Sequence, residues 1–431
     1  MIIDALSRML LLCRDFIPQD VTEAQLADAF ASHTVEIVVD ERNLGSPACQ
    51  SAVITFAQQV QAMGLAVNYV GPDATLVAAQ PPWKAVTIYG VLDELAGEGL
   101  PGARITIAKS DSLPRSVFVF GDSPYAGRDG WRLSATKFSG TVVRVHEPAP
   151  RWREVFPLGG LAAVTAAAAE PFKAVLRAIV PHPAINAEQL APVDTVKIVL
   201  APDELDVNVS FGDVDCISGG AIMQAALHAL LRLPGASGRF RVFEPQNLDL
   251  SNLNRYPLAR RSGANRPKII GLESCSTETL RITGVPSQYD ADLSAVTKVA
   301  NKVLVGTDNV PARWLAQETA PGWLGIGATS HFEAMASEHG PTVGGGCGGC
   351  AHPTNDNVVA TIPTVSFVSY AAGLMLAARL VLHNSGVVSD AAKQAMSMLA
   401  LRLDTKFGQW ARAVAIDEEC PVHSARRAAR R

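Results

Sequence analysis

The stretch DVDCISGGAIMQAALHALLRLPGASGRFRVFEPQNLDLSNLNR, residues 213–255, decides the fold class of this chain. Its apolar pattern predicts a strand at 213–217, a helix at 221–233 and a second strand at 240–243. A helix that joins two strands in this way is the repeating unit of a parallel α/β sheet. We therefore expect a Rossmann-like domain in this half of the chain.

Polar residues stand at the ends of both predicted strands. Ser218-Gly219-Gly220 separates the first strand from the helix, where glycines let a phosphate approach the N–H groups at the positive end of the helix dipole. Glu244 ends the second strand, the position from which a carboxylate binds a ribose hydroxyl. A full dinucleotide fingerprint would have glycine in place of Ile217 and Ile222. A plain turn and a nucleotide site are therefore both compatible with these residues alone.

The alternation of strands and helices runs through the rest of the chain. Further strands are expected at 35–39, 65–70, 117–120, 141–145 and 303–305, and a helix at 47–63. An Ala-rich amphipathic helix ends each half, at 159–180 and 367–383. Residues 181–194 hold three prolines and no apolar period, so we expect one α/β domain at 1–190 and a second at 191–431. The pattern fits a tandem duplication as well as two unrelated domains.

Composition excludes several classes of protein. Of the 431 residues 48% are hydrophobic and 18% are charged, which excludes a mainly disordered chain. The net charge is −4 and no basic block occurs, so neither a nucleic-acid surface nor a membrane surface is expected. The apolar run at 365–382 contains Arg379 and two serines, which predicts a buried helix. Seven cysteines and no export signal predict a soluble protein of the reducing cytoplasm.

A more specific pattern begins at Glu244 and reads EPQNLDLSNLNRY. Lys268 follows Arg255 by thirteen residues, and VLVGTDNVPAR at 303–313 holds Asp308-Asn309 after a strand-like run. Together these residues resemble the D-x-D-x-V-x-x-S-N-L-N-R-Q signature, the later lysine and the Asp-Asn-x-x-x-Arg of the ThiF and ubiquitin-activating-enzyme adenylation superfamily. The resemblance covers about half the chain, and it implies that the second of two tandem Rossmann-like α/β domains is a ThiF-type adenylation domain.

The resemblance also implies roles for single residues. ATP and Mg²⁺ would be the cofactors, because a carboxylate attacking a phosphate needs the phosphates held and their growing charge neutralised. Arg255, Lys268 and Asp308 would be catalytic, with Asp308 as the magnesium ligand. The nucleotide would contact Gly219, Gly220, Glu244, Asn252, Arg255, Lys268 and Asn309. Arg313 is either a further residue of this site or a surface arginine.

Three departures from the signature keep an inactive relative open as an alternative. Glu244 and Gln246 replace two aspartates, Tyr256 replaces a glutamine, and two loop glycines are missing. A longer glutamate can still reach a ribose, and both Arg255 and Lys268 are retained. The alternative to an enzyme is a pseudoenzyme that binds a ubiquitin-like tail without activating it.

Two short motifs indicate a zinc site. Cys347-Gly-Gly-Cys350 and Cys420-Pro-Val-His423 supply two chelating turns, which together complete a tetrahedral set of sulfur and nitrogen ligands. The superfamily often has CxxC at both positions, so His423 would replace one cysteine, and His352 is a rival fourth ligand. A redox-active CxxC beside an unrelated C-terminal motif is the other interpretation.

Some relatives carry a further cysteine after the CxxC that accepts the activated carboxyl group. None occurs here between Cys350 and Cys420, including the expected active-site crossing loop that follows Cys350. Cys216 is expected in the core, which leaves Cys275 as the one exposed candidate of this domain. We therefore expect the partner to leave as an adenylate or to pass to the thiol of a second protein.

The resemblance predicts ATP-dependent adenylation of the C-terminal carboxylate of a ubiquitin-like or small β-grasp protein. Bacterial relatives share this layout, with a divergent, inactive first domain, and several accompany conjugating enzymes in phage-defence gene clusters. A sulfur-carrier or peptide adenylyltransferase is the alternative within the superfamily. A nicotinamide-dependent oxidoreductase would fit Glu244 but gives no reason for Lys268 or the SNLNR motif.

The first domain is expected to stand in for the second subunit of the dimers that simpler relatives form. In those dimers an arginine near one N-terminus reaches the ATP of the other subunit. Arg8 and Arg14 are the candidates here, against the commoner role of surface arginines on a first helix. The expected assembly is a monomer with pseudo-dimeric domains or a homodimer.

Overall fold

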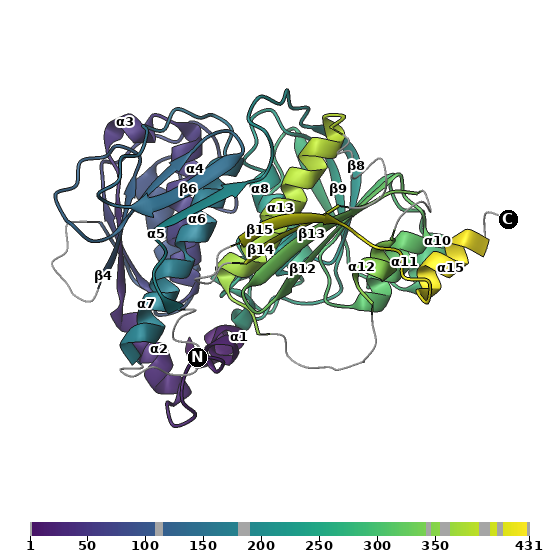
Figure 1. The fold of residues 1–431 in the computed structure, drawn as a ribbon, viewed down its shortest axis with the longest axis horizontal. Coiled ribbons are helices and arrows are strands. Elements are labelled where there is room, and N and C mark those ends of the chain that lie inside the picture. Colours follow the sequence, from purple (N-terminus) through teal and green to yellow (C-terminus); the bar gives the residue numbers. More distant parts are fainter. Residues whose placement is uncertain are drawn as a thin grey trace.

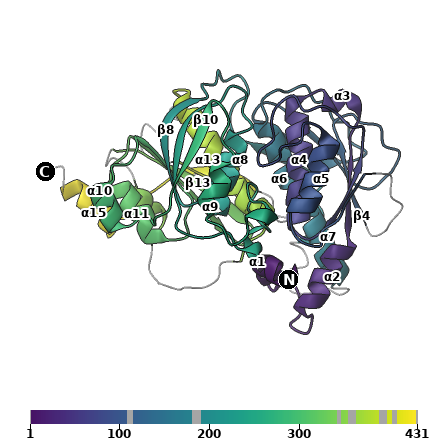
Figure 2. The same ribbon diagram turned by 180° about the vertical axis from the view of Figure 1, so that it is seen from behind.

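The computed structural model describes residues 2–107, 115–179, 190–341, 346–353, 363–387, 397–402 and 408–428. Two α/β domains lie side by side, each built on one sheet with helices packed against it (Figure 1; from behind, Figure 2). Most of the expected linker, residues 180–189, lies outside the described residues.

The first domain contains a seven-stranded sheet in the order β3-β2-β1-β4-β5-β6-β7. The pairs from β3 to β5 are parallel, and β6 and β7 add to this edge in antiparallel fashion. The strands span β1 Thr34–Val38, β2 Ala66–Val70, β3 Ile105–Ile107, β4 Arg115–Phe120, β5 Trp131–Ala135, β6 Ser139–Arg144 and β7 Thr195–Val199. Because β7 belongs to this sheet, the first sheet extends past residue 190, where the sequence placed the boundary.

The second domain contains an eight-stranded sheet in the order β10-β9-β8-β11-β12-β13-β14-β15. The pairs from β10 to β12 are parallel, and the last three strands are antiparallel. The strands span β8 Ser210–Ile217, β9 Ser237–Phe243, β10 Leu280–Val285, β11 Lys302–Val305, β12 Trp323–Ser330, β13 Glu333–His339, β14 Ser397–Arg402 and β15 Gly408–Ala413.

The two sheets repeat one topology. In each, the first strand has the second and third on one side, the fourth and fifth on the other, and antiparallel strands beyond the fifth. This confirms the expectation of tandem Rossmann-like domains. The shared order, down to the antiparallel edge, favours a duplication over two unrelated α/β domains.

All four segments that the sequence predicted as helices are helical, and the structure contains further helices as well. The first domain holds α1 Ile2–Cys13, α2 Glu23–Ser32, α3 Glu41–Leu44, α4 Pro47–Ala62, α5 Ile88–Glu98, α6 Leu158–Ala167 and α7 Ala169–Ile179. The second holds α8 Ala221–Leu230, α9 Lys268–Glu273, α10 Ala291–Val296, α11 Val310–Glu318, α12 Gly348–Ala351, α13 Ser366–Asn384 and α15 Pro421–Ala428, with short 3₁₀ turns η2 Leu250–Asn252 and η3 Arg261–Gly263. The helix expected at 159–180 is divided at Ala168, and Pro171 lies in the first turn of α7, which tolerates proline.

The core of the second domain depends on a close approach of α8 and α13. A Cβ atom on Gly373 of α13 would lie 2.4 Å from the carbonyl oxygen of Ile222 and 2.7 Å from the amide nitrogen of Ala226, so only glycine fits there. α13 is also long and apolar enough to cross a membrane, but 89% of its most apolar window is buried inside the protein. It therefore packs as a core helix, as expected from the sequence.

The two domains share one apolar core. Phe172 of α7 packs 5.8 Å, between ring centroids, from both Phe332 and Phe367 of the second domain. The Gln58 side-chain amide of α4 donates to the carbonyl of Pro257 at 2.7 Å. The Gln409 side chain of β15 bonds both the N–H and the carbonyl of Val199 on β7, which links the edges of the two sheets.

Candidate functional site

A polar cavity of about 260 Å³ lies at the carboxyl ends of β8, β9 and β11. β9, which follows β8 in the chain, lies on one side of β8, and β11 lies on the other side. Open α/β sheets bind ligands at this kind of switch in strand order. The lining comprises Arg8, Ser218, Gly220, Ala221, Ile222, Glu244, Gln246, Asn252, Arg255, Tyr256, Lys268, Gly306, Thr307, Asp308, Arg313, Thr329, Thr364 and Ser369. Most of the residues that the sequence singled out are therefore together.

The turn between β8 and α8 forms one wall. Ser218 adopts a φ of +88°, a strained value for a residue with a side chain, and its hydroxyl accepts the N–H of Gly220 at 2.9 Å. Gly220 is the N-cap of α8, and within the described residues no side chain caps this helix. The N–H groups of its first turn therefore face the cavity ready for an anion.

Two backbone amides hold the Glu244 carboxylate, one of which belongs to this turn. One carboxylate oxygen accepts the N–H of Gly219 at 2.9 Å and the other accepts the N–H of Gln246 at 2.9 Å. A Cβ atom on Gly219 would lie 3.1 Å from Cγ of Glu244, so a side chain at 219 would push the carboxylate away. Gly219 thus positions Glu244 and does not itself line the cavity.

Lys268 begins α9 and points at Glu244. Its ammonium donates to Oε1 of Gln246 at 2.6 Å and lies 3.6 Å from Oε1 of Glu244, with both charged side chains at most 5% exposed. Gln246, which stands where the resembled signature has an aspartate, is therefore a hydrogen-bond partner of the lysine.

Arg255 and Asn252 come from the SNLNR segment. The Arg255 guanidinium donates to the Ser251 carbonyl and to the Asn254 side chain, both at 2.8 Å, and stacks 5.3 Å from the centre of the Tyr256 ring. Asn252 takes part in the capping box of η2, where its side chain accepts the N–H of Asp249. Burial lowers the pKa of Arg255, and the positive Arg8 lowers it further. An anion in the cavity would relieve both effects.

Asp308 and Asn309 follow β11 but differ in role. Asp308 lines the cavity. Asn309, which the sequence also placed at the nucleotide, caps α11 instead, because its side chain accepts the N–H of Ala312 at 3.0 Å. Asn309 is not among the residues that line the cavity.

Arg313 lies inside the protein rather than on its surface. It is 9% exposed, and burial lowers the pKa of its guanidinium to about 10. Two of its nitrogens donate to the Thr307 carbonyl, at 2.9 and 2.7 Å, and a third lies 3.2 Å from Nδ1 of His352. Arg313 thereby fixes the loop that carries Asp308 and joins it to the residue after α12.

The first domain supplies one basic residue to this cavity. Arg8 of α1 is part of the lining, and its carbonyl accepts the N–H of Thr364 in the second domain at 3.2 Å. Phe16, just after α1, packs 5.3 Å from Phe332. Arg14 is directed elsewhere and donates to the Val21 carbonyl. Of the two candidate arginines, α1 brings only Arg8 to the site.

Three thiols form a candidate metal site. The Sγ atoms of Cys347, Cys350 and Cys420 lie within 4.8 Å of one another, and Cys347 is 3.6 Å from each of the other two. Zn–S bonds at tetrahedral angles would set sulfurs roughly 3.8 Å apart, whereas a disulfide would need about 2.05 Å. Burial raises the pKa of the Cys347 thiol to about 12, so thiolates here need a cation beside them. The donor set fits zinc.

The two histidines considered as fourth ligand differ in position. His423 is 1% exposed and lies on α15, three residues after Cys420. His352 is turned to Arg313 and Ser337, whose hydroxyl is 3.5 Å from its Nε2. Among the residues that the structure describes, the cluster of ligand atoms within 4.8 Å comprises the three cysteines. The engagement of His352 leaves His423 as the fourth ligand of our hypothesis.

The expectation of an exposed Cys275 is wrong. Its side chain is 2% exposed, lies against the carbonyl of Gly271, and has its pKa raised to about 11 by burial. The segment ends in a turn, in which the Cys275 N–H donates to the Leu272 carbonyl at 3.0 Å, and the sequence pattern did not reveal this turn. Cys216 is fully buried in β8, as expected, and burial raises its pKa as well. The expected crossing loop, 354–362, lies outside the described residues.

The corresponding position of the first domain is filled by its own side chains. Asp40 follows β1 and Asp122 follows β4, and the Asn43 amide donates to both carboxylates, at 2.7 and 2.9 Å. Arg42 pairs with Asp40 at 2.8 Å. A Cβ atom on Gly121 would lie 2.2 Å from the Asn43 oxygen, which shows how little space remains there.

Comparisons with known proteins give distant similarities, and no protein-family model matches. The chain is 26% identical over 232 residues to the uncharacterized protein y4jF of Sinorhizobium fredii, an alignment that covers 53% of this chain and 43% of that protein. It therefore spans less than half the length of this curated relative. Among solved structures, E. coli MccB with the peptide MccA-N7isoAsn aligns at a TM-score of 0.42 and 12% identity, over 50% of this chain and 67% of that chain. PaaA aligns at 0.39 and 14%, over 48% and 65%.

Proposed function

We propose that this protein is an ATP-dependent adenylyltransferase of the ThiF superfamily, which activates the C-terminal carboxylate of a peptide or small protein and releases pyrophosphate. One observation carries the proposal. The cavity at the β8 and β11 ends gathers four basic side chains, Arg8, Arg255, Lys268 and Arg313, with only two acidic ones, Glu244 and Asp308. Lys268 and Arg313 are buried, and Arg8 and Arg255 are partly exposed. An excess of cations beside an uncapped helix N-terminus suits a polyphosphate.

The side chains divide the binding tasks between them. Arg255, Lys268 and Asn252 would hold the phosphates, Glu244 the ribose, and Asp308 the Mg²⁺ ion, which hard carboxylate oxygens bind well. When bound, MgATP supplies the electrophilic phosphorus and the pyrophosphate leaving group. The chain's part is to orient the carboxylate and to neutralise charge, for which the Arg255 and Lys268 cations are already fixed by hydrogen bonds. Gly219 and Gly220 have no side chains with which to contact the nucleotide, so their part in this proposal is to shape the turn.

The first domain acts in this proposal as an internal second subunit. Arg8 brings a further positive charge to the phosphates, and the filled position between Asp40 and Asp122 supports an inactive first domain. In this proposal a single chain therefore contains both halves of a pseudo-dimer. Residues 1–190 and β7 form its inactive half, and the remainder to residue 431 forms its active half.

The partner that we propose is a ubiquitin-like or other small β-grasp protein with an accessible C-terminal tail. MccB has been crystallised with ATP and with the peptide MccA, which supports a peptide-like carboxylate as the substrate class. A sulfur-carrier protein or a free peptide is the alternative partner. A conjugating-enzyme-like protein would receive the activated carboxyl group, because Cys216 and Cys275 are both buried thiols. We place the reaction in the cytoplasm and propose a role in antiviral defence.

Zinc has a structural role in this proposal. Cys347, Cys350, Cys420 and His423 would close the metal on all four sides and leave no open position for chemistry. The Gly348 amide donates to the Gln317 side chain at 3.0 Å, and the Trp314 indole donates to the His352 carbonyl at 3.1 Å. The turn that holds Cys347 and Cys350 therefore contacts α11, which begins two residues after Asp308.

Pyrophosphate exchange separates the competing functions. The enzyme should incorporate labelled pyrophosphate into ATP only with Mg²⁺ and a tail-bearing carboxylate partner, and Asp308→Ala should abolish this exchange. Arg281 is an exposed residue of β10 in the same domain, so Arg281→Ala is the control and should keep the pyrophosphate exchange. A nicotinamide-dependent oxidoreductase would bind NAD and show no exchange. A non-catalytic scaffold would bind the partner tail without exchange.

A further inference from the structure

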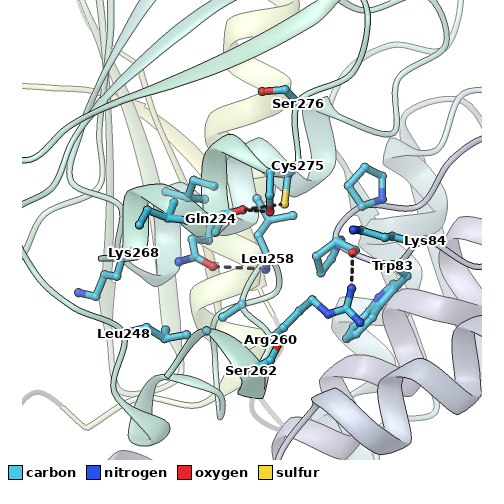
Figure 3. A pocket seen from close by; sticks show the side chains of 18 of the residues that line it. Trp83, Lys84, Gln224, Leu248, Leu258, Arg260, Ser262, Lys268, Cys275 and Ser276 are labelled. Atoms are coloured by element: carbon cyan, nitrogen blue, oxygen red, sulfur yellow. Dashed lines mark hydrogen bonds between the residues drawn. The ribbon is translucent and has the colours of Figure 1, made fainter. Parts of the chain in front are cut away.

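A second and larger cavity, of about 670 Å³, opens between the two domains (Figure 3). The first domain contributes residues 79–84, and the second contributes η3, α9 and the residues that follow α9. Lys268 borders this cavity as well as the first one, but its ammonium is turned to Gln246 and Glu244. In Figure 3 Lys268 lies on the side opposite Trp83 and Lys84. The two cavities are therefore neighbours with separate polar groups.

Apolar side chains from both domains form most of the interdomain cavity's wall. The first domain supplies two prolines and an indole, and the second supplies three leucines: Pro81, Pro82, Trp83, Leu248, Leu258 and Leu272. Trp83 is 4% exposed, so its ring is a fixed wall rather than a mobile surface side chain. A wall of this kind favours a ligand with an aromatic or branched apolar group.

The charged groups of this cavity are mostly basic. Apart from Lys268, the lining contains Lys84, Arg260 and Arg266 against a single acid, Glu278. Arg260 lies 5.7 Å from the centre of the Trp83 ring and donates to the Pro82 carbonyl, as Figure 3 shows. Two carboxylates of α5 outside the lining pair with Arg260, Glu94 at 3.4 Å and Glu98 at 4.0 Å. Lys84 and Arg266 are therefore the lining cations that no carboxylate of the described residues pairs with.

Buried donors at the same place lack acceptors. Among the described residues, Nε1 of Trp83 and Nε of Arg260 are buried and make no hydrogen bond. Arg232 lies behind the Pro81 wall and donates through one nitrogen to the Pro81 and His228 carbonyls, while its Nε and one further nitrogen have no acceptor among these residues. Buried donors without acceptors are rare in folded proteins, so the polar packing between the two domains is incomplete beside this cavity.

We propose that the interdomain cavity binds a carboxylate that carries an aromatic or branched apolar group. The apolar group packs on Trp83 and the prolines, and the carboxylate accepts hydrogen bonds from Lys84 and Arg266, because Arg260 is already engaged with Glu94 and Glu98. Both domains contribute, so the site exists only in the tandem arrangement. It needs no bound nucleotide and is independent of the adenylation reaction proposed above.

The test uses the intact protein and three probes, in saturation-transfer NMR and calorimetric titrations without nucleotide. 3-Phenylpropionate has both features of the proposed ligand, 3-phenylpropionamide lacks the charge, and propionate lacks the ring. We expect 3-phenylpropionate to bind and each analogue to bind at least about tenfold more weakly. The amide loses a hydrogen bond to a charged group, and propionate loses the burial of its ring. Equal binding of acid and amide, or no binding of the acid, would overturn the proposal.

A pair of glycine substitutions locates the probe. Gly271 of α9 lines the cavity, and a Cβ atom there meets no atom within 4 Å, so Gly271→Leu fills the cavity without a clash. Gly97 of α5 is likewise helical, exposed and unobstructed but lies outside the cavity, so Gly97→Leu is the matched control. Binding of 3-phenylpropionate should be lost in the first variant and unchanged in the second. Binding that survives Gly271→Leu, or that is displaced by MgATP, would place the probe elsewhere and refute the site.

Discussion

Replacing Lys268 with methionine separates the two tasks that this residue performs. The Lys268 and Glu244 side chains are 3% and 5% exposed and lie 3.6 Å apart, so the charges are a buried pair. Methionine keeps an unbranched chain of similar shape but leaves the Glu244 carboxylate without its cation. Glu244 still accepts the amides of Gly219 and Gln246, so the local fold should survive.

The effect on stability follows from the charge that remains buried. Removing one partner of a buried ion pair costs about 3–5 kcal/mol, and the two backbone hydrogen bonds of Glu244 favour the lower end, about 3 kcal/mol. The double variant Lys268→Met/Glu244→Gln leaves no unpaired charge. Its free energy of unfolding in urea should therefore recover most of this loss.

The effect on ATP binding should not recover in the same way. A hydrogen bond from an ammonium to a phosphate contributes about 1.5–3 kcal/mol, which is roughly a 10- to 150-fold change in Kd. Calorimetric titration with MgATP should show this weakening in the single variant and at least as much in the double variant, because Glu244→Gln also changes the proposed ribose ligand. A Kd within threefold of wild type in Lys268→Met would refute the assignment of this lysine to the phosphates. A double variant no more stable than the single one would refute the buried-charge argument.

Three further predictions test other parts of the site. Arg8→Ala should weaken MgATP binding by about 10- to 150-fold in the same titration, whereas Arg14→Ala, whose side chain bonds Val21 instead, should leave it unchanged. Metal analysis should find one zinc per chain. Cys347→Ser and His423→Ala should lose both the zinc and thermal stability, whereas Cys275→Ser and His352→Ala should keep them. Zinc that is lost in His352→Ala and kept in His423→Ala would reverse the choice of histidine. Gly373→Ala should destabilise the fold by about 1–3 kcal/mol in urea unfolding, because its Cβ would meet the backbone of α8. Gly97→Ala should not destabilise it, because a Cβ there meets no atom within 4 Å. Equal stability of the two variants would contradict the packing argument.

Local patterns were sufficient to predict much of the fold. The strand at 213–217, the helix at 47–63 and the core helix at 367–383 match β8, α4 and α13 to within a few residues, since each has a clear apolar period and flanking turn residues. The domain boundary was harder to predict. β7 follows the proline-rich segment, yet it pairs with β6, and such long-range pairing leaves no mark in the local sequence.

Residues close to one another in sequence were also easier to assign to the site than residues from distant elements. Glu244, Asn252, Arg255, Lys268 and Asp308 line one cavity, and all but Asp308 lie within 25 residues of one another. Asn309 caps α11, a role that an asparagine after a strand often takes, and its contact with the nucleotide stays a prediction. The burial of Cys275 and the interdomain cavity depend on which surfaces pack together, and a single sequence does not contain that information.

The tandem arrangement gives a physical reason why one chain carries two copies of the same topology. In the first copy the position beyond β1 and β4 is occupied by Asn43, Asp40 and Asp122, whose side chains bond one another. In the second copy the equivalent position is open and rich in basic groups, one of which, Arg8, comes from the first copy. The first copy also supplies Trp83 and its neighbouring prolines to the interdomain cavity. A second domain on its own would lack Arg8 and one wall of that cavity. The first copy therefore contributes to ligand sites outside its own sheet, although side chains occupy the position beyond its own β1 and β4.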